Sequence, residues 1–226
     1  RNIASERDFN RLEISGVEPN FVESTMSDFE GNIPSAISNI ESRQKFDGDA
    51  KNIVLNLMAL LAIRTPHMRS NLGKFFSEIA DATIESLIAT EEGWNANLSK
   101  LKDEHTDRPS YKDMKSFIES KQYTIKMRQE FHIGMEFRAV EMIVNALNQR
   151  NWTLVIANPQ SDFICTNNPV ALSWNNPSEI PLFYRSHPGL GMPDTTVQFP
   201  LSRKTLLLGT FEQAQPLLFA DENTVA

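Results

Sequence analysis

Residues 49–69 constrain the fold more than any other stretch, because they are apolar around nearly the whole circumference of a helix. The apolar positions are Ile53, Val54, Leu55, Leu57, Met58, Leu60, Leu61 and Ile63. A helix that is hydrophobic on all sides belongs in the interior of a domain. Asn52 and Asn56 interrupt the run, which is also too short to span a membrane. We therefore expect a buried central helix.

This helix is predicted to end at Arg64-Thr65-Pro66. The residue before a proline avoids the α region, so the helix stops close to Arg64. An unpaired guanidinium at the end of a buried helix would be costly, and Arg64 therefore needs a partner. Glu23 and Glu30 lie on a helix that must pack nearby, and we expect Arg64 to pair with one or both.

The composition excludes several classes of protein. The 226 residues carry a net charge of −7, with 22 basic and 29 acidic side chains. This balance leaves no broad footprint for nucleic-acid binding. Cys165 is the only cysteine, so no internal disulfide forms, and without a signal peptide we expect a cytoplasmic protein. The chain starts at Arg1 and stops at Ala226 without a natural end, and we expect it to be truncated at both ends.

The pattern of elements predicts the α+β class. Helical periodicity continues, with short interruptions, to about residue 151. Its longest region begins at Ser110, and one break is expected inside it near Tyr123 or Gly134. Short β-favouring runs follow at 152–157, 163–165, 170–174, 181–184, 195–199 and 205–210. Asn-Pro and Pro-Gly turns connect them, and short connections favour antiparallel pairing. We expect an N-terminal helical bundle (1–151) around the central helix, followed by a small antiparallel β-sheet (152–226), in one intimately packed domain.

Several motifs together resemble a known family. They are Arg64-Thr65-Pro66, the strand-turn Phe-Ile-Cys-Thr-Asn-Asn-Pro-Val at 163–170, Phe-Pro-Leu-Ser at 199–202, Phe21-Val22-Glu23, Phe29-Glu30 and Asn2-Ile3-Ala4. The pattern, spread over nearly the whole chain, resembles the uncharacterised bacterial domain-of-unknown-function family 4238. The family's turn usually reads Ser/Thr-Asp-Asn-Pro, and Asn167 stands at the aspartate position here. The resemblance implies membership and no particular activity.

Glu23 and Glu30 are the first candidate site residues. They are seven residues apart, so both point the same way on a regular helix. Paired carboxylates can bind a divalent cation or share acid–base work. In the alternative, Glu23 caps its own helix and Glu30 pairs with an arginine. The four histidines show no metal-ligand spacing, so no cofactor is evident and a divalent metal has no support beyond this carboxylate pair.

Cations and amides supply the other candidates. Arg64 and Arg69 flank Pro66, with Thr65 between them, and a fixed guanidinium can clamp a phosphate or carboxylate. The alternative for Arg64 is a buried ion pair. Asn167 and Asn168 either form a structural turn or present an amide to a pocket.

Two functions remain open from these residues. One is a hydrolytic enzyme, a phosphoesterase or nuclease, with a polar pocket between helices and sheet. Its lining would be Glu23, Glu30, Arg64, Asn168 and Ser202. The alternative is a non-catalytic module that binds a small anion or a protein partner through the same residues. Ser202 lies in no nucleophile-elbow sequence.

Overall fold

The computed structural model describes residues 16, 18, 20–100, 109–186 and 188–220. The chain divides into two compact units, Arg1–Thr65 with Ile133–Ala226, and Pro66–His132. The predicted change from helix to strand at residues 151–152 lies inside the first unit. Helices and a five-stranded sheet are both present, which confirms the α+β class.

Four helices contribute to the first unit: α1 (Phe21–Glu30), α2 (Ile33–Arg43), α3 (Gly48–Ile63) and most of α7 (Gln129–Asn148). The turn from α2 to α3 depends on two left-handed residues, Gln44 (φ 51°) and Gly48 (φ 62°). Glycine adopts this conformation without a steric penalty. Asp49 in the first turn of α3 complements the helix dipole. The helix ends at Ile63, as the proline at 66 predicts.

The sheet has the strand order β2-β3-β4-β1-β5. Its strands are β1 (Asn151–Ile156), β2 (Ala171–Trp174), β3 (Thr195–Pro200), β4 (Thr205–Thr210) and β5 (Leu217–Phe219). The pairs β1–β4, β2–β3 and β3–β4 are antiparallel, but β1–β5 is parallel. Thr210 at the end of β4 lies opposite Asn151 at the start of β1. A chain that turns back there runs in the direction of β1, so the expected antiparallel sheet is a mixed one.

Two of the predicted strands are wrong. Residues 163–165 form no strand, and residues 181–184 instead lead into the short helix α8 (Leu182–Arg185), which follows a 3-10 turn, η1 (Pro177–Glu179). β5 was not predicted. Short apolar runs do not distinguish a strand from one helical turn by periodicity alone, which explains the error at α8.

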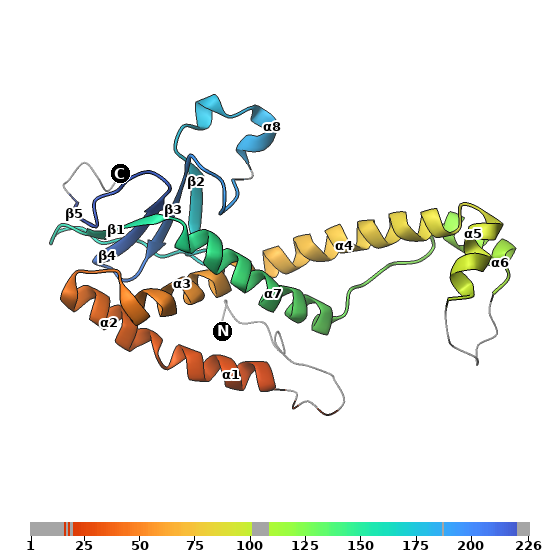
Figure 1. Ribbon diagram of the computed structural model, residues 1–226, viewed down its shortest axis with the longest axis horizontal. Coiled ribbons are helices and arrows are strands. Elements are labelled where there is room, and N and C mark those ends of the chain that lie inside the picture. The colour runs from red at the N-terminus through yellow and green to blue at the C-terminus, as the bar shows by residue number, and fades with distance from the viewer. Residues whose placement is uncertain (1–15, 17, 19, 101–108, 187, 221–226) are drawn as a thin grey trace. The chain divides into compact units, whose positions relative to one another are not determined.

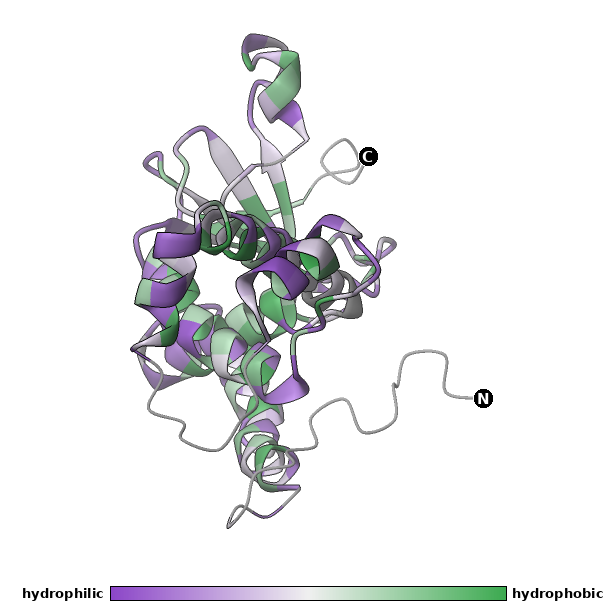
Figure 2. Cartoon of the chain, turned by 90° about the vertical axis from the view of Figure 1, so that its right-hand side faces the viewer, coloured by the Kyte–Doolittle hydropathy of each residue, from purple (hydrophilic) through white to green (hydrophobic). Residues whose placement is uncertain are grey.

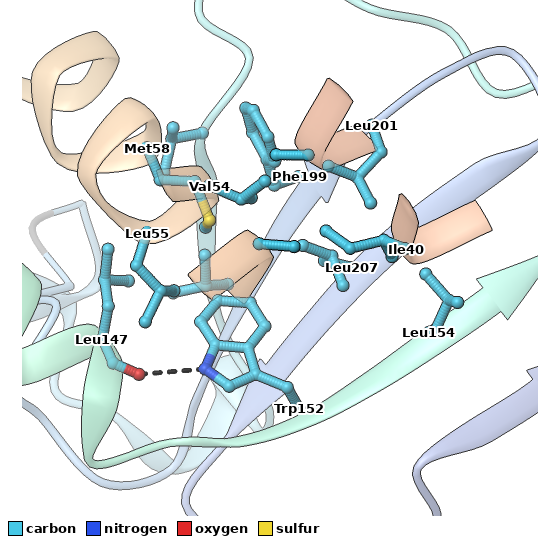
Figure 3. Packing of buried hydrophobic residues seen from close by; sticks show 14 residues of the cluster. Ile40, Val54, Leu55, Met58, Leu147, Trp152, Leu154, Phe199, Leu201 and Leu207 are labelled. Atoms are coloured by element: carbon cyan, nitrogen blue, oxygen red, sulfur yellow. Dashed lines mark hydrogen bonds between the residues drawn. The ribbon is translucent and has the colours of Figure 1, made fainter. Parts of the chain in front are cut away.

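The main core lies between α2 and α3 and one face of the sheet (Figures 1 and 3). The register places Phe199 of β3 opposite Leu207 of β4, and Leu207 opposite Leu154 of β1. These three side chains form one row across the sheet. Ile40 of α2 and Met58 of α3 belong to the same cluster. Alternating burial along β3 and β4 confirms that one face of these strands packs inward.

The central helix α3 is buried on one face rather than on all sides. Val54, Leu55 and Met58 are fully buried, whereas Leu57 and Leu60 are only half-buried. Ala59 and Ile63 are buried as well, and in the described part of the chain several other apolar side chains of the helix keep some exposure. The expectation that Leu57 and Leu60 lie in a fully buried helix is therefore wrong.

This difference in burial predicts a graded loss of stability. Met58→Ala should lower the free energy of unfolding by about 2–5 kcal/mol, because it opens a cavity between α3 and the sheet. Leu57→Ala should cost less than about 2 kcal/mol, because that side chain already contacts water. Urea denaturation of both variants measures the difference. Equal losses would contradict the one-sided burial of α3.

The second unit consists of α4 (Pro66–Leu87), α5 (Glu91–Leu98), α6 (Tyr111–Glu119) and an extended segment that leads into α7. Thr90 and Ser110 cap α5 and α6 by accepting hydrogen bonds from the backbone N–H groups of Gly93 and Asp113. The expected break near Tyr123 is present, and it is longer than a kink: residues 122–128 are not helical.

The extended segment runs back along α4 (Figure 1). The Lys121 ammonium pairs with Glu85, the Tyr123 hydroxyl donates to Asp81 Oδ1 at 2.8 Å, and Ser77 Oγ donates to the Ile125 carbonyl at 3.1 Å. Two residues of extended chain advance about 6.7 Å and four residues of a helix about 6 Å. The two repeats match, so every second residue of the segment meets every fourth residue of α4.

Candidate functional site

Arg64 pairs with a carboxylate that the sequence analysis did not consider. It caps the C-terminus of α3, and its Nε lies 3.8 Å from Oε2 of Glu136 on α7. The two side chains are 13% and 4% exposed. The expectation that Arg64 pairs with a carboxylate is met by Glu136, which was not among the candidates. One signal was available: Glu136 lies in the same helical stripe as Ile133 and Val140, where a carboxylate is out of place.

Among the described residues, the gap beside this ion pair is too narrow for a substrate. Val22, Leu60, Ile133 and Phe137 line a narrow gap beside it, with about 180 Å³ of unfilled space into which no water-sized sphere fits. A bound phosphate or carboxylate needs more room than a water molecule. A buried pair of this kind specifies how α3 and α7 pack more than it stabilises them.

Glu23 and Glu30 lie on the exposed side of α1. The opposite side of the helix carries Val22, which is buried and packs with Met26 against Ile133 of α7. This amphipathic packing turns both carboxylates toward solvent. The Glu30 side chain has no cationic partner in the described part of the chain.

Asn167 and Asn168 lie in an exposed turn between β1 and β2. Thr166 Oγ1 accepts a hydrogen bond from the Asn168 N–H at 3.2 Å and donates to the Asn168 carbonyl at 3.0 Å. Such side-chain bonds hold a turn together locally. Val170 then enters the core, so the turn positions the start of β2. Cys165 beside it is exposed.

Ser202 belongs to a separate polar cluster. Its Oγ donates to Glu41 Oε1 at 2.6 Å, and Thr205 Oγ1 donates to the same oxygen at 2.7 Å. The Lys204 N–H in turn donates to Ser202 Oγ at 3.1 Å. Glu41 comes from α2, so the cluster attaches that helix to the turn between β3 and β4. Glu41 was not singled out from the sequence.

The predicted site residues are therefore distributed over different parts of the chain. Thr65 is half-buried next to Arg64 in the first unit, whereas Arg69 belongs to α4 of the second, with its side chain outside the described residues. Arg64 bonds to Glu136, Ser202 bonds to Glu41, and Asn168 bonds within its own turn. These three groups share no hydrogen-bonded member among the described residues.

Arg150 is a buried cation that the sequence analysis missed. It is 3% exposed and lies between α7 and β1. One terminal nitrogen donates to the carbonyls of Thr195 and Gly209 at 2.8 and 2.9 Å. The other donates to the Leu190 carbonyl at 2.6 Å and to Thr195 Oγ1 at 2.8 Å. The guanidinium also lies over the Phe211 ring, 4.4 Å from its centroid.

Burial lowers the pKa of Arg150 from its ordinary 12.5 to about 10. The side chain therefore stays protonated at neutral pH. Its Nε is buried without a hydrogen-bond partner, and its acceptors are neutral carbonyl and hydroxyl oxygens. All the acceptors belong to strands or loops of the first unit. Arg150 thus joins β3, β4 and the loop before β3 that contains Leu190, and we call it a clamp for this reason.

The excursion between β2 and β3 carries three consecutive apolar side chains that are strongly exposed. Leu182, Phe183 and Tyr184 of α8 are 80%, 83% and 60% exposed, and we call these three residues the apolar tip. In Figure 2, part of this excursion, at the top of the view, has the green colour of hydrophobic residues. These residues were predicted to form a strand and were not among the candidate site residues.

Hydrogen bonds hold the excursion in shape. Arg185 donates from Nε to the Ile180 carbonyl at 2.6 Å and from its second terminal nitrogen to the Ser178 carbonyl at 3.0 Å. Trp174 Nε1 donates to the Arg185 carbonyl at 3.0 Å. The Asn175 N–H donates to the Asp194 carbonyl at 2.8 Å and closes the base. The apolar tip therefore stands on an ordered scaffold.

Within the described residues, no group of three or more His, Cys, Asp or Glu side chains could hold a metal ion. A helix long and apolar enough to cross a bilayer is likewise absent from that part of the chain.

The fold and these polar clusters define an α+β protein in which a mixed sheet is covered by helices on one face and carries an exposed apolar excursion. The chain belongs to the family described as Protein of unknown function (DUF4238), whose family model matches residues 1–225. The resemblance seen in the sequence motifs is thereby confirmed. Comparisons with curated proteins and with solved structures give no match.

Proposed function

We propose that this protein is a non-catalytic interaction module that binds another protein through the apolar tip. The observation that supports the proposal is the exposure of three contiguous large apolar side chains, Leu182, Phe183 and Tyr184, on a hydrogen-bonded scaffold. Exposed apolar residues that occur singly need no explanation, but a contiguous group of this kind is typical of an interaction site.

The scaffold favours tight binding. Aromatic side chains that enter a partner's pocket supply a large share of the energy of many interfaces. Binding costs less when the loop that carries them is already ordered. Arg185 and Trp174 supply that order here, because their hydrogen bonds hold both ends of α8.

A partner of a different sequence fits the tip better than a second copy of this chain or a bilayer. Side chains of this size bury about 150–250 Å² each, so two tips in contact fall short of the roughly 800 Å² per partner of a standard interface. The net charge of −7 opposes approach to an anionic membrane surface. A concave apolar pocket on another protein is limited neither by the small area of a contact between two tips nor by the charge of a membrane surface.

The hydrolase hypothesis receives no support from the geometry. Glu30 and Asn168 are exposed on different elements, and Arg64 pairs with Glu136 beside a gap too narrow for water. A catalytic site requires its groups within hydrogen-bond reach of one reacting centre. The same narrow gap gives no support to anion binding at Arg64 among the described residues.

Phe183→Ser is expected to weaken binding to the partner at least about 10-fold, because it removes an aromatic anchor. The tagged chain is used to isolate candidate partners, and each is then purified and titrated directly by isothermal calorimetry. Phe219→Ser serves as the matched control, since Phe219 is also strongly exposed (68%) but lies on β5, outside the tip.

Equal affinity of the wild type and Phe183→Ser for every partner so identified would contradict the proposal. Sedimentation with phosphatidylcholine vesicles tests the membrane alternative. Vesicle binding by the wild type that Phe183→Ser abolishes and Phe219→Ser preserves would reassign the tip to a lipid surface.

A further inference from the structure

We propose that residues 122–128 of the second unit form an open β-edge, to which an extended acidic peptide adds as a partner strand. This binding surface is separate from the apolar tip and does not depend on the proposed function. The argument rests on the backbone geometry of the segment, its unpaired amides, its attachment to α4 and the charge of its exposed face.

The segment has the side-chain alternation of a strand. Gln122, Thr124, Lys126 and Arg128 are exposed, and the intervening residues 123, 125 and 127 are half-buried. A period of two is the signature of extended chain with one covered face. The covered face is the one that contacts α4, through the Tyr123 hydroxyl on Asp81. This hydrogen bond also raises the pKa of Tyr123.

The backbone of the segment has almost no partners. In the described part of the chain, the N–H groups of residues 123–128 donate no hydrogen bond, and of the carbonyls at 123–127 the Ile125 carbonyl alone accepts one, from Ser77. A row of unpaired N–H and C=O groups is a template for another strand. Peptide-binding domains that add a strand to an exposed edge use the same geometry.

Attachment to α4 prepares the segment for binding. The contacts of Lys121, Tyr123 and Ile125 with Glu85, Asp81 and Ser77 hold its first half, up to residue 125, against α4. A peptide that adds to it therefore orders only itself, which lowers the entropic cost of association. A free two-stranded hairpin lacks such support and is marginally stable in water.

An open groove lies next to the segment and accommodates the added strand. It has a volume of about 540 Å³, and its lining includes Lys74 and Glu78 of α4, Lys126 of the segment and His132 of α7. His132 belongs to the second unit, and its ring lies against Gly73, where a Cβ would approach Cε1 to 3.3 Å. The groove thus runs along α4 beside the segment and is open to solvent.

The exposed face of the segment selects the charge of the peptide. It carries the cations Lys126 and Arg128 and no anion. The Nε of Arg128 lies 4.0 Å from Glu130, but the arginine side chain is 87% exposed, so this pair is weak. Residues directly opposite each other on paired strands interact, and opposite charges favour pairing. The added strand should therefore carry Asp or Glu at alternate positions on this face.

Titration of the full chain with labelled seven-residue peptides tests the proposal. The probe is an acetylated, amidated peptide that alternates Glu with Val, and its binding is followed by fluorescence anisotropy. We expect it to bind at least about 10-fold tighter than the same peptide with Lys in place of Glu. Lys126→Glu should remove this preference, whereas Lys112→Glu, the same charge change on the exposed face of α6, should leave it intact.

Two backbone readouts separate strand addition from simple charge attraction. Alternate residues of a strand direct their N–H groups to opposite edges. Peptide binding should therefore slow hydrogen exchange at every second amide of residues 123–128. Two further peptides carry N-methyl groups, one at the Glu positions and the other at the Val positions. Only the peptide whose methyl groups lie on the edge away from the segment should bind.

Three results would overturn the proposal. One is the absence of binding by the Glu peptide. Another is unchanged exchange at residues 123–128 in the presence of saturating peptide. The third is equal affinity of both N-methylated peptides, which would show that side-chain charge alone attracts the peptide.

Discussion

Replacing Arg150 with methionine should lower the free energy of unfolding by about 3–5 kcal/mol. The substitution leaves the carbonyls of Leu190, Thr195 and Gly209 without the donors that Arg150 supplies. Buried carbonyls that lose their partner bear the full cost of desolvation. Arg150→Lys should recover only part of the loss, because an ammonium cannot replace the planar fork that reaches two separate elements.

Urea denaturation followed by circular dichroism measures these losses. Arg43→Met is the matched control, because it removes the same side chain from an exposed pair with Asp47. That change should cost less than about 1 kcal/mol. If Arg150→Met and Arg43→Met unfold at the same urea concentration, the clamp is not a main determinant of stability.

Trp152→Ala should destabilise the first unit by about 3–5 kcal/mol, because the indole contacts three elements. Its Nε1 donates to the Leu147 carbonyl at the end of α7 at 3.0 Å (Figure 3). Its ring packs edge-on against Phe46, which precedes α3. The ring also covers Gly209 of β4, where a Cβ would lie 2.7 Å from its nearest ring carbon. Glycine is required there by this close approach.

A double-mutant cycle tests the packing of Trp152 on Gly209. Gly209→Ala should cost about 1–3 kcal/mol in the wild type, because the added methyl displaces the ring. In the Trp152→Leu background its cost should fall markedly, since the clash is absent. Gly134→Ala is the control, because among the described residues a Cβ added there meets no atom within 4 Å beyond its own stretch of helix, and alanine favours the helix. Additive effects of the two substitutions would show that the ring does not impose glycine at 209.

The fold class and most elements were predictable because their signals are local. The helices around 21–63, the strands beginning near 152, 195 and 205, and the stop before Pro66 all follow from periodicity and turn residues within a few positions. The errors have local causes as well. Residues 181–184 are too short for periodicity to decide, and β5 (Leu217–Phe219) is shorter still.

Burial of α3 was only half predictable. An apolar circumference indicates an interior helix, but the number of neighbours that cover it depends on elements distant in sequence. Leu57 and Leu60 are as apolar as Leu55, yet only Leu55 is fully buried. The local sequence determined that the helix is apolar. The packing of distant elements around it decided which of its side chains are fully buried.

By itself, the sequence determined the α+β class, family membership, the end of α3 and the need of Arg64 for a carboxylate. The tertiary structure alone decided that the carboxylate is Glu136, that Ser202 bonds to Glu41 and that Arg150 is buried among carbonyls. The physical reason is the separation in sequence between the residues that interact. Helix periods, turns and caps are set by residues a few positions apart, whereas these polar contacts join residues 40 to 161 positions apart and depend on how the elements pack.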